Sequence, residues 1–318
     1  MIALWGDREW VPGDEAAAAA GLEPAFIARA WRAAGLPDRA PEPGTHRFAD
    51  PDVELFRIIR AGIDLLGEDV TIHLLRVIGA AAARVADAAA SAFLVNVAAP
   101  AARHDTSGLA LARANVESLS LLDGVTRAFD TLLRHHLERT IRPFDVLDKL
   151  SGIDLVRCTV GFADLVDSTA WGQQLALHEL APALTRFDDV ASEIVVERGG
   201  RVVKLIGDEV MFVADEAGPA LEIAFALIDA FAAHEMLPAV RIGIATGELV
   251  ARDGDVSGSV VNIAARAVKL ASPSSLLVDD ATRTALRGSA AFTCTEGRPH
   301  AIKGFAEPVH LCQVRRRV

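Results

Sequence analysis

The 318-residue sequence predicts an all-α segment followed by a mixed α/β (α+β) domain. Up to about residue 142, apolar residues recur at three-to-four spacing, as they do on amphipathic helices. After residue 150, short β-branched runs alternate with helical patterns, which is typical of an α/β domain. A hydrophobic content of 51% lets both parts bury a core. We therefore expect residues 1–150 to form an all-α domain and residues 151–318 to form the α/β domain.

Two short helical patterns lie within residues 1–50. They are DEAAAAAGL and PAFIARAWRAAGLP, separated by Gly21 and Pro24, and their spacing resembles a helix-turn-helix unit. DNA-binding modules usually present a basic face, but this segment holds five arginines and no lysine against eight acids. We therefore expect no DNA partner and favour a packing or dimerisation role. A DNA-binding regulator with a nucleotide-binding module is the alternative, which a salt-sensitive affinity for duplex DNA would support.

Residues 51–150 continue the helical pattern, and their last segment predicts a long linker helix. The segments are VELFRIIRAGIDLL, IHLLRVIGAAAARVADAAASAFLVNV and LALARANVESLSLLDGVTRAFDTLLRHHL. His104, His135 and His136 lie in or next to the last two segments, so a protonation switch is one interpretation and simple surface exposure is another. An apolar ligand held among these helices is a further hypothesis, although such apolar stripes are usually core.

Five short strands are expected in the second half of the chain. They are DLVRCTVGFADL, GRVVKLIG, EVMFVA, AVRIGIATGELV and SSLLVDD. Helical patterns separate them, among them LAPALTRFDDVASEIVVE and GPALEIAFALIDAFAAH.

The sequence predicts neither export nor a membrane span. The N-terminus lacks a basic n-region, and the longest uncharged stretch, from Ala88, is Ala-rich and interrupted by Asn96. Cys158, Cys294 and Cys312 are far apart and odd in number, which argues against a disulfide framework or a metal knuckle. A net charge of −11 disfavours nonspecific attraction to nucleic acid or anionic membrane. We therefore expect a cytoplasmic protein.

Two carboxylates mark a candidate metal site. Asp164 ends the strand VGFAD, and Asp208 follows the glycine of a hairpin turn. Neighbouring strands lie about 4.8 Å apart, so both carboxylates could hold a pair of hard cations about 3.5–4 Å apart. Oxygen ligands completed by substrate phosphates suit Mg²⁺. Each acid taken alone also fits a plain strand end or a turn.

A second group of residues suits phosphate chemistry. Asn262 and Arg266 are four residues apart and share one face of a predicted helix, where Arg can fork two phosphate oxygens and Asn can orient them. A solvated helix face is the plain alternative. Lys303 precedes Gly304, where a flexible ammonium could reach a triphosphate.

Together these motifs resemble the catalytic domain of the class III nucleotidyl cyclases, over about residues 156–316. The motifs that carry the resemblance, in order, are FADLVDST, GGRVVKLIGDEV, VRIGIATGELV, DVSGSVVNIAAR and IKGFAEPV. The resemblance implies a ferredoxin-like palm core and an adenylyl cyclase that makes cyclic AMP and pyrophosphate from ATP. It assigns two Mg²⁺ (or Mn²⁺) to Asp164 and Asp208.

The resemblance also distributes the other roles. Asn262 would orient the ribose, Arg266 would stabilise the transition state and Lys303 would hold the triphosphate. Because the family builds its sites head-to-tail across a dimer, it implies a homodimer whose lone protomer is inactive. The helical half resembles the regulatory domain of soluble actinobacterial cyclases, some of which are pH-responsive, on AGLEPAFIARAWRAAGLP and FADPDVELFRI.

The same resemblance assigns recognition of the base to Lys204 and Asp255. Adenine presents an acceptor at N1 and a donor at its 6-amino group, which match an ammonium donor and a carboxylate acceptor. Guanine reverses that pattern, so ATP is favoured and a guanylyl cyclase is the alternative. The chain has only four lysines, and two of them fall where the mechanism needs an ammonium, at Lys204 and Lys303.

Two residues near the metal acids depart from the family pattern, and one turn also resembles a rival family. Asp167 stands where many members of the family have glycine, and Glu209 stands where a small or apolar residue is common. Both add negative charge near the metals. The turn IGDEV also resembles diguanylate cyclases, but that family lacks the helix that carries VNIAAR.

Overall fold

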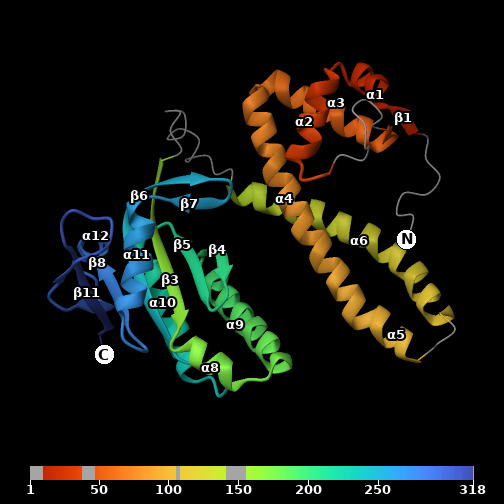
Figure 1. The fold of residues 1–318 in the computed structure, drawn as a ribbon. Coiled ribbons are helices and arrows are strands. Elements are labelled where there is room, and N and C mark those ends of the chain that lie inside the picture. The colour runs from red at the N-terminus through yellow and green to blue at the C-terminus, as the bar shows by residue number, and fades with distance from the viewer. Residues whose placement is uncertain (1–9, 38–46, 105–107, 141–154, 318) are drawn as a thin grey trace. The chain divides into compact units, whose positions relative to one another are not determined.

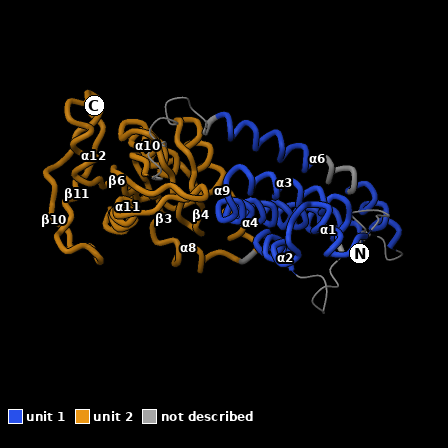
Figure 2. Tube along the Cα trace, turned by 90° about the horizontal axis from the view of Figure 1, so that it is seen from above, with its two compact units in different colours: residues 1–143 blue, residues 144–318 orange. Residues whose placement is uncertain are grey.

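A computed structural model describes residues 10–37, 47–104, 108–140 and 155–317 of the chain (Figure 1). The chain forms two compact units, residues 1–143 and 144–318, which are coloured separately in Figure 2. The domain boundary expected at residue 150 lies outside the described residues.

The first unit begins with three helices around an aromatic cluster. The helices are α1 (Gly13–Ala20), α2 (Pro24–Ala33) and α3 (Asp50–Leu66). Trp31, Phe48 and Phe56 are buried among them, with ring centroids 4.9–6.1 Å apart in edge-to-face arrangements. The two helices expected within residues 1–50 are therefore present, and they share one core with α3.

A small sheet in this unit departs from the all-α expectation. Strand β1 (Trp10–Pro12) pairs antiparallel with β2 (Arg47–Ala49). Each strand has only three residues, which is too short to show an alternating pattern in the sequence. The ladder places Phe48 in the aromatic cluster, so burial of one ring explains why this short pairing forms.

Long helices complete the first unit. Helix α4 (Glu68–Phe93) continues through a π-helical turn, η1 (Leu94–Ala98), into α5 (Ala99–His104), and α6 (Leu109–Thr140) follows. Both α5 and η1 contact α6. Among the described residues, the helical stretch Glu68–Arg103 is long and apolar enough to cross a membrane, judged by length and composition alone. Little of its most apolar part is buried. One such helix is weak evidence for a span.

The second unit is a nine-stranded sheet flanked by helices (Figure 1). Its strands are β3 (Leu155–Leu165), β4 (Arg201–Ile206), β5 (Glu209–Ala214), β6 (Val240–Arg252), β7 (Asp255–Ser257), β8 (Leu276–Asp279), β9 (Phe292–Cys294), β10 (Arg298–His300) and β11 (Val309–Arg316). Their order is β10-β11-β8-β6-β3-β5-β4, with β7 beside β6 and β9 beside β11. All five expected strands are confirmed, as β3, β4, β5, β6 and β8.

The helices of this unit are α8 (Ser168–Gln174), α9 (Leu177–Glu197), α10 (Ala217–Ala232), α11 (Ser259–Leu270) and α12 (Asp280–Ala285). The succession β3-α9-β4-β5-α10-β6, with spatial order β4-β5-β3-β6 and antiparallel pairing, is the ferredoxin-like arrangement. The palm core expected from the sequence is therefore confirmed.

Two apolar cores lie on opposite faces of the sheet. Successive strand residues point to opposite faces. Phe162 and Met211 accordingly pack in the core under α11, whereas Ala163 and Phe212 pack in the core under α9 and α10. This alternation determines which side chains at the ends of β3 and β5 pack in a core and which can contribute to a site.

Helix α11 lies unusually close to strand β6. A Cβ atom added to Gly243 would lie 2.2 Å from the backbone nitrogen of Val268 and 2.5 Å from the carbonyl oxygen of Ala264. Only glycine permits this approach. The contact sets the height above the sheet of the helix that carries Asn262 and Arg266.

Candidate active site

The ends of three adjacent strands bring Asp164 and Asp208 to one place. Asp164 is the penultimate residue of β3 and lies opposite Glu209 of β5 and Arg241 of β6. Asp208 sits in the turn between β4 and β5, where Gly207 has a φ of 65°. The backbone N–H of Leu165 donates to the carbonyl oxygen of Asp208 at 3.1 Å, which ties this turn to β3.

Both carboxylates line one polar cavity of about 690 Å³. The other lining residues come from the β3–α8 connection, α8, the β4–β5 turn, β6 and α11, and they are Leu165, Asp167, Ser168, Thr169, Ala170, Gln173, Ile206, Glu209, Arg241 and Lys269. This space has the volume of a small-molecule site.

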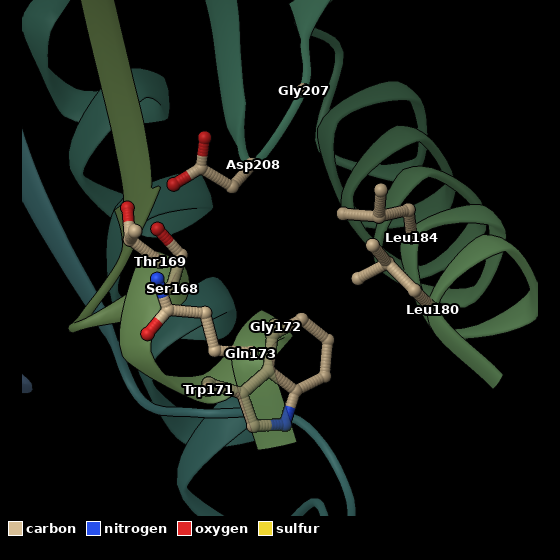
Figure 3. A pocket seen from close by; sticks show the side chains of 9 residues that line it. All are labelled: Ser168, Thr169, Trp171, Gly172, Gln173, Leu180, Leu184, Gly207 and Asp208. Atoms are coloured by element: carbon tan, nitrogen blue, oxygen red, sulfur yellow. The ribbon is translucent and has the colours of Figure 1, made fainter. Parts of the chain in front are cut away.

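A second cavity of about 380 Å³ shares Asp208 (Figure 3). Figure 3 shows Trp171 on one side and Leu180 and Leu184 of α9 on another, with Ser168 and Thr169 near the Asp208 carboxylate. Asp167 is the N-cap residue of α8, with a φ of 51° in the left-handed region, and its side chain does not cap the helix. This cavity therefore joins a polar end at Asp208 to an apolar end at α9.

Asp164 is buried and held by two cations of its own chain. Arg241 donates from Nε and Nη2 to Oδ2 of Asp164, at 2.8 and 2.6 Å. Lys269 donates from Nζ to Oδ1 at 2.8 Å. The Asp164 side chain is only 3% exposed, so these two partners offset the cost of burying its charge.

Glu209, the additional acid next to Asp208, is bound by Lys269. Lys269 also donates to Oε2 of Glu209 at 2.7 Å, and the Glu209 side chain is 14% exposed. Burial opposes the charge on Lys269, but its hydrogen bonds to Asp164 and Glu209 outweigh burial and raise the pKa of the ammonium. Glu209 therefore belongs to an ion-pair network.

Arg241 and Lys269 were not among the residues predicted for the site from the sequence. The scarcity of lysine was a signal, because Lys269 is one of only four and was left without a role. Neither residue is near Asp164 in the chain, since 77 and 105 positions separate them from it.

The carboxylates of Asp164 and Asp208 suit a divalent cation whose other ligands come from a bound phosphate or from water. Among the described residues, no three His, Cys, Asp or Glu side chains converge as a metal site. Asp164 and Asp208 alone leave most coordination positions of Mg²⁺ to water or phosphate oxygens, as this ion commonly has them. A cation at Asp164 would meet Lys269 on one oxygen and Arg241 on the other.

Lys204 and Asp255 lie side by side. Lys204 donates from Nζ to Oδ2 of Asp255 at 2.6 Å, with the two side chains 41% and 52% exposed. The β4–β5 register shifts between Val202 and Lys204, and Asp255 begins β7. The hydrogen bond from Lys204 lowers the pKa of Asp255, which favours the ionised carboxylate.

Asn262 and Arg266 occupy the exposed face of α11, one turn apart. Ala264 and Val268 are buried on the opposite face. Lys303 is exposed in the turn before Gly304. None of Asn262, Arg266 and Lys303 lines either cavity at Asp208. One chain thus groups the two acids with each other, and Lys204 with Asp255, but leaves these three residues outside the acidic cavity.

Residues 154–313 match the family described as the adenylate and guanylate cyclase catalytic domain. The chain belongs to this family. It is therefore a cyclase enzyme, and the class III resemblance stated from its motifs is confirmed.

Curated relatives extend beyond the catalytic domain. An uncharacterized protein of Mycobacterium tuberculosis is 34% identical over 312 residues, which cover 97% of this chain and 80% of that protein. An adenylate cyclase of Streptomyces coelicolor is 32% identical over 286 residues, covering 88% of this chain and 72% of the relative. The crystal structure of the adenylyl cyclase CyaB from P. aeruginosa covers 51% of this chain and 94% of its own at 22% identity, with a TM-score of 0.46.

Proposed function

We propose that this cyclase converts ATP into 3′,5′-cyclic AMP and pyrophosphate. The observation that carries the choice of base is the Lys204–Asp255 contact of 2.6 Å. It presents a charged donor beside a charged acceptor at a partly exposed position, which matches N1 and the 6-amino group of adenine. Guanine would leave both groups facing like partners, which selects against GTP. The name of the Streptomyces coelicolor relative supports the same substrate.

The reaction is an intramolecular phosphoryl transfer. The ribose 3′-oxygen attacks the α-phosphorus, the bond to the pyrophosphate oxygen breaks, and the 3′-hydroxyl proton passes to solvent. Two Mg²⁺ or Mn²⁺ ions held by Asp164 and Asp208 would lower the pKa of that hydroxyl and neutralise phosphate charge. Arg266 meets the charge that develops on the phosphate, Asn262 orients the ribose and Lys303 holds the triphosphate.

A homodimer completes this site. Asn262 and Arg266 are exposed and lie outside the cavity of their own Asp164 and Asp208. A second copy arranged head-to-tail would supply them to the acids of the first, and a lone protomer would be inactive. ATP is abundant in the cytoplasm and the three cysteines are free, so we place the enzyme there, without a DNA partner.

The helical unit would gate this activity. His135 and His136 are exposed on α6, and Nδ1 of His135 lies 3.6 Å from Oε2 of Glu138. A positive charge on His135 would strengthen that contact. Replacing both histidines by glutamine should flatten the pH–activity profile of the full chain, and an unchanged profile would remove them as sensors.

The test of the reaction uses the purified full chain with ATP or GTP and with Mg²⁺ or Mn²⁺. Cyclic nucleotide and pyrophosphate should form in equal amounts, and faster from ATP.

Asp208→Ala should reduce turnover by at least about a hundredfold. Asp208 is half-buried in a turn, so this variant should fold, whereas Asp164→Ala would leave Arg241 and Lys269 without their shared partner. Asp164→Asn is therefore the matched second variant. Full activity in both, with unchanged melting temperature, would overturn the proposal.

A further inference from the structure

The two oxygens of Asp164 have partners of different kinds. Oδ2 receives two N–H groups from Arg241, whose side chain is 28% exposed. Arg241 lies directly opposite Asp164 in the β3–β6 register, so strand pairing holds it in place. Two donors from a planar guanidinium on one oxygen make a rigid contact.

Oδ1 has a looser partner. The Lys269 side chain is 48% exposed, and its ammonium sits on a flexible four-carbon stem in the last turn of α11. Water can replace its hydrogen bonds easily at that exposure. Lys269 is therefore the partner of Asp164 that can leave.

Glu209 can retain the Lys269 ammonium after its contact with Asp164 is broken. Nζ of Lys269 contacts Oε2 of Glu209 at 2.7 Å at the same time as Oδ1 of Asp164 at 2.8 Å. Releasing Asp164 breaks one contact and keeps the other. Both acids and the lysine line the same polar cavity as Asp208.

We propose that Lys269 is a built-in competitor of the divalent cation, occupying Asp164 in the metal-free site and withdrawing to Glu209 when a cation binds. The proposal rests on the metal site of the proposed function and adds to it. Lys269 offsets part of the negative charge of the empty cavity and sets the cation concentration at which the site fills. A divalent ion on Oδ1 would repel an ammonium on the same oxygen, because like charges about 4 Å apart interact unfavourably at protein dielectric values.

Direct Mn²⁺ binding tests this without any need for turnover. The electron paramagnetic resonance signal of free Mn²⁺ is followed as the metal alone is titrated into the full chain. Lys269→Met removes the charge and keeps the length of the side chain, and it should bind Mn²⁺ about tenfold more tightly than the wild type. Lys269→Arg keeps the charge and should stay within about threefold of the wild type or bind more weakly.

Arg198→Met is the control for loss of one positive charge. Arg198 contacts Glu197 at the end of α9 and lines neither cavity, so its variant should change the affinity by less than about twofold. In the Asp164→Asn background, Lys269→Met should lose its gain, because the contested oxygen is then no longer an anion.

Two results separate this inference from the function beneath it. If Asp164→Asn weakens Mn²⁺ binding but Lys269→Met binds no more tightly than the wild type, the competitor is disproved and the metal site stands. If neither Asp164→Asn nor Asp208→Ala changes Mn²⁺ binding, the metal site itself is wrong, and the role of Lys269 falls with it.

Discussion

At the scale of single residues, the choice of base depends on the charges at Lys204 and Asp255. Lys204→Glu with Asp255→Cys replaces the donor by an acceptor and removes the carboxylate. The double variant should lower the ratio of kcat/KM for ATP to that for GTP by at least about tenfold, since each base then meets a different partner. Initial rates with both nucleotides measure the ratio. Arg198→Gln, which removes a charge elsewhere in the same unit, should leave the ratio unchanged.

Asp279 gives a prediction about pH and stability. Burial raises its pKa from the model-compound value of 3.8, against the hydrogen bonds that Oδ1 accepts from the backbone N–H groups of Thr282 and Thr246. A raised folded pKa means that the folded state holds its proton when the unfolded state has lost it. The contribution to stability is therefore full below pH 3.8 and is lost as the pH rises through the folded pKa.

Asp279→Asn keeps the cap of α12 and cannot ionise. Its free energy of unfolding, relative to the wild type, should increase as the pH is raised from about 4 to 7. Urea unfolding at several pH values measures this difference. A difference that shrinks over that range would contradict the assignment of burial as the dominant cause.

The grouping of side chains was predictable where the residues belong to motifs that resemble a known family. The proximity of Lys204 to Asp255 follows the expectation that both recognise one base. The cations around Asp164 were not predictable, because their contacts depend on the β3–β6 register and on the height of α11 above the sheet. No local pattern encodes either quantity.

At the scale of elements, the position of α11 depends on Gly243. Gly243→Ala would drive a methyl group into the backbone of Val268 and Ala264, which cannot yield as a side-chain tip can. We expect a loss of about 2–3 kcal/mol of stability. We also expect a fall in kcat, because the shifted helix misplaces Asn262 and Arg266. Urea denaturation and initial rates test the two effects.

Gly218→Ala is the matched control for this variant. Gly218 lies in the first turn of α10, where an added Cβ meets nothing within 4 Å. The control should unfold within about 0.5 kcal/mol of the wild type and keep its kcat. Equal stability of both variants would show that α11 can move away from β6 at no cost.

Long elements were predictable and short ones were not. The five expected strands are apolar or β-branched runs of four to thirteen residues, and the long helices of the first unit carry three-to-four patterns over many residues. Strands β1, β2, β7, β9 and β10 have three residues each, so tertiary pairing, not local pattern, determines them. The same holds for the turn that carries Lys303, whose place depends on β10 and β11.

At the scale of the whole molecule, the proposed dimer predicts complementation. Asp208→Ala should lack the cation site, and Arg266→Ala should lack the group that meets the phosphate charge, so each should be inactive alone. A head-to-tail dimer of one chain of each kind contains one site built from two intact halves and one site with both defects.

Mixing equal amounts of the two variants, with exchange of protomers, should restore about a quarter of the wild-type activity, since about half of the dimers are mixed. Coexpression with two affinity tags isolates the mixed dimer, whose activity should be about half that of the wild type. A mixed dimer as inactive as its parents would show that each chain builds its site alone, and Asn262 and Arg266 would then need a path to the acids of their own chain.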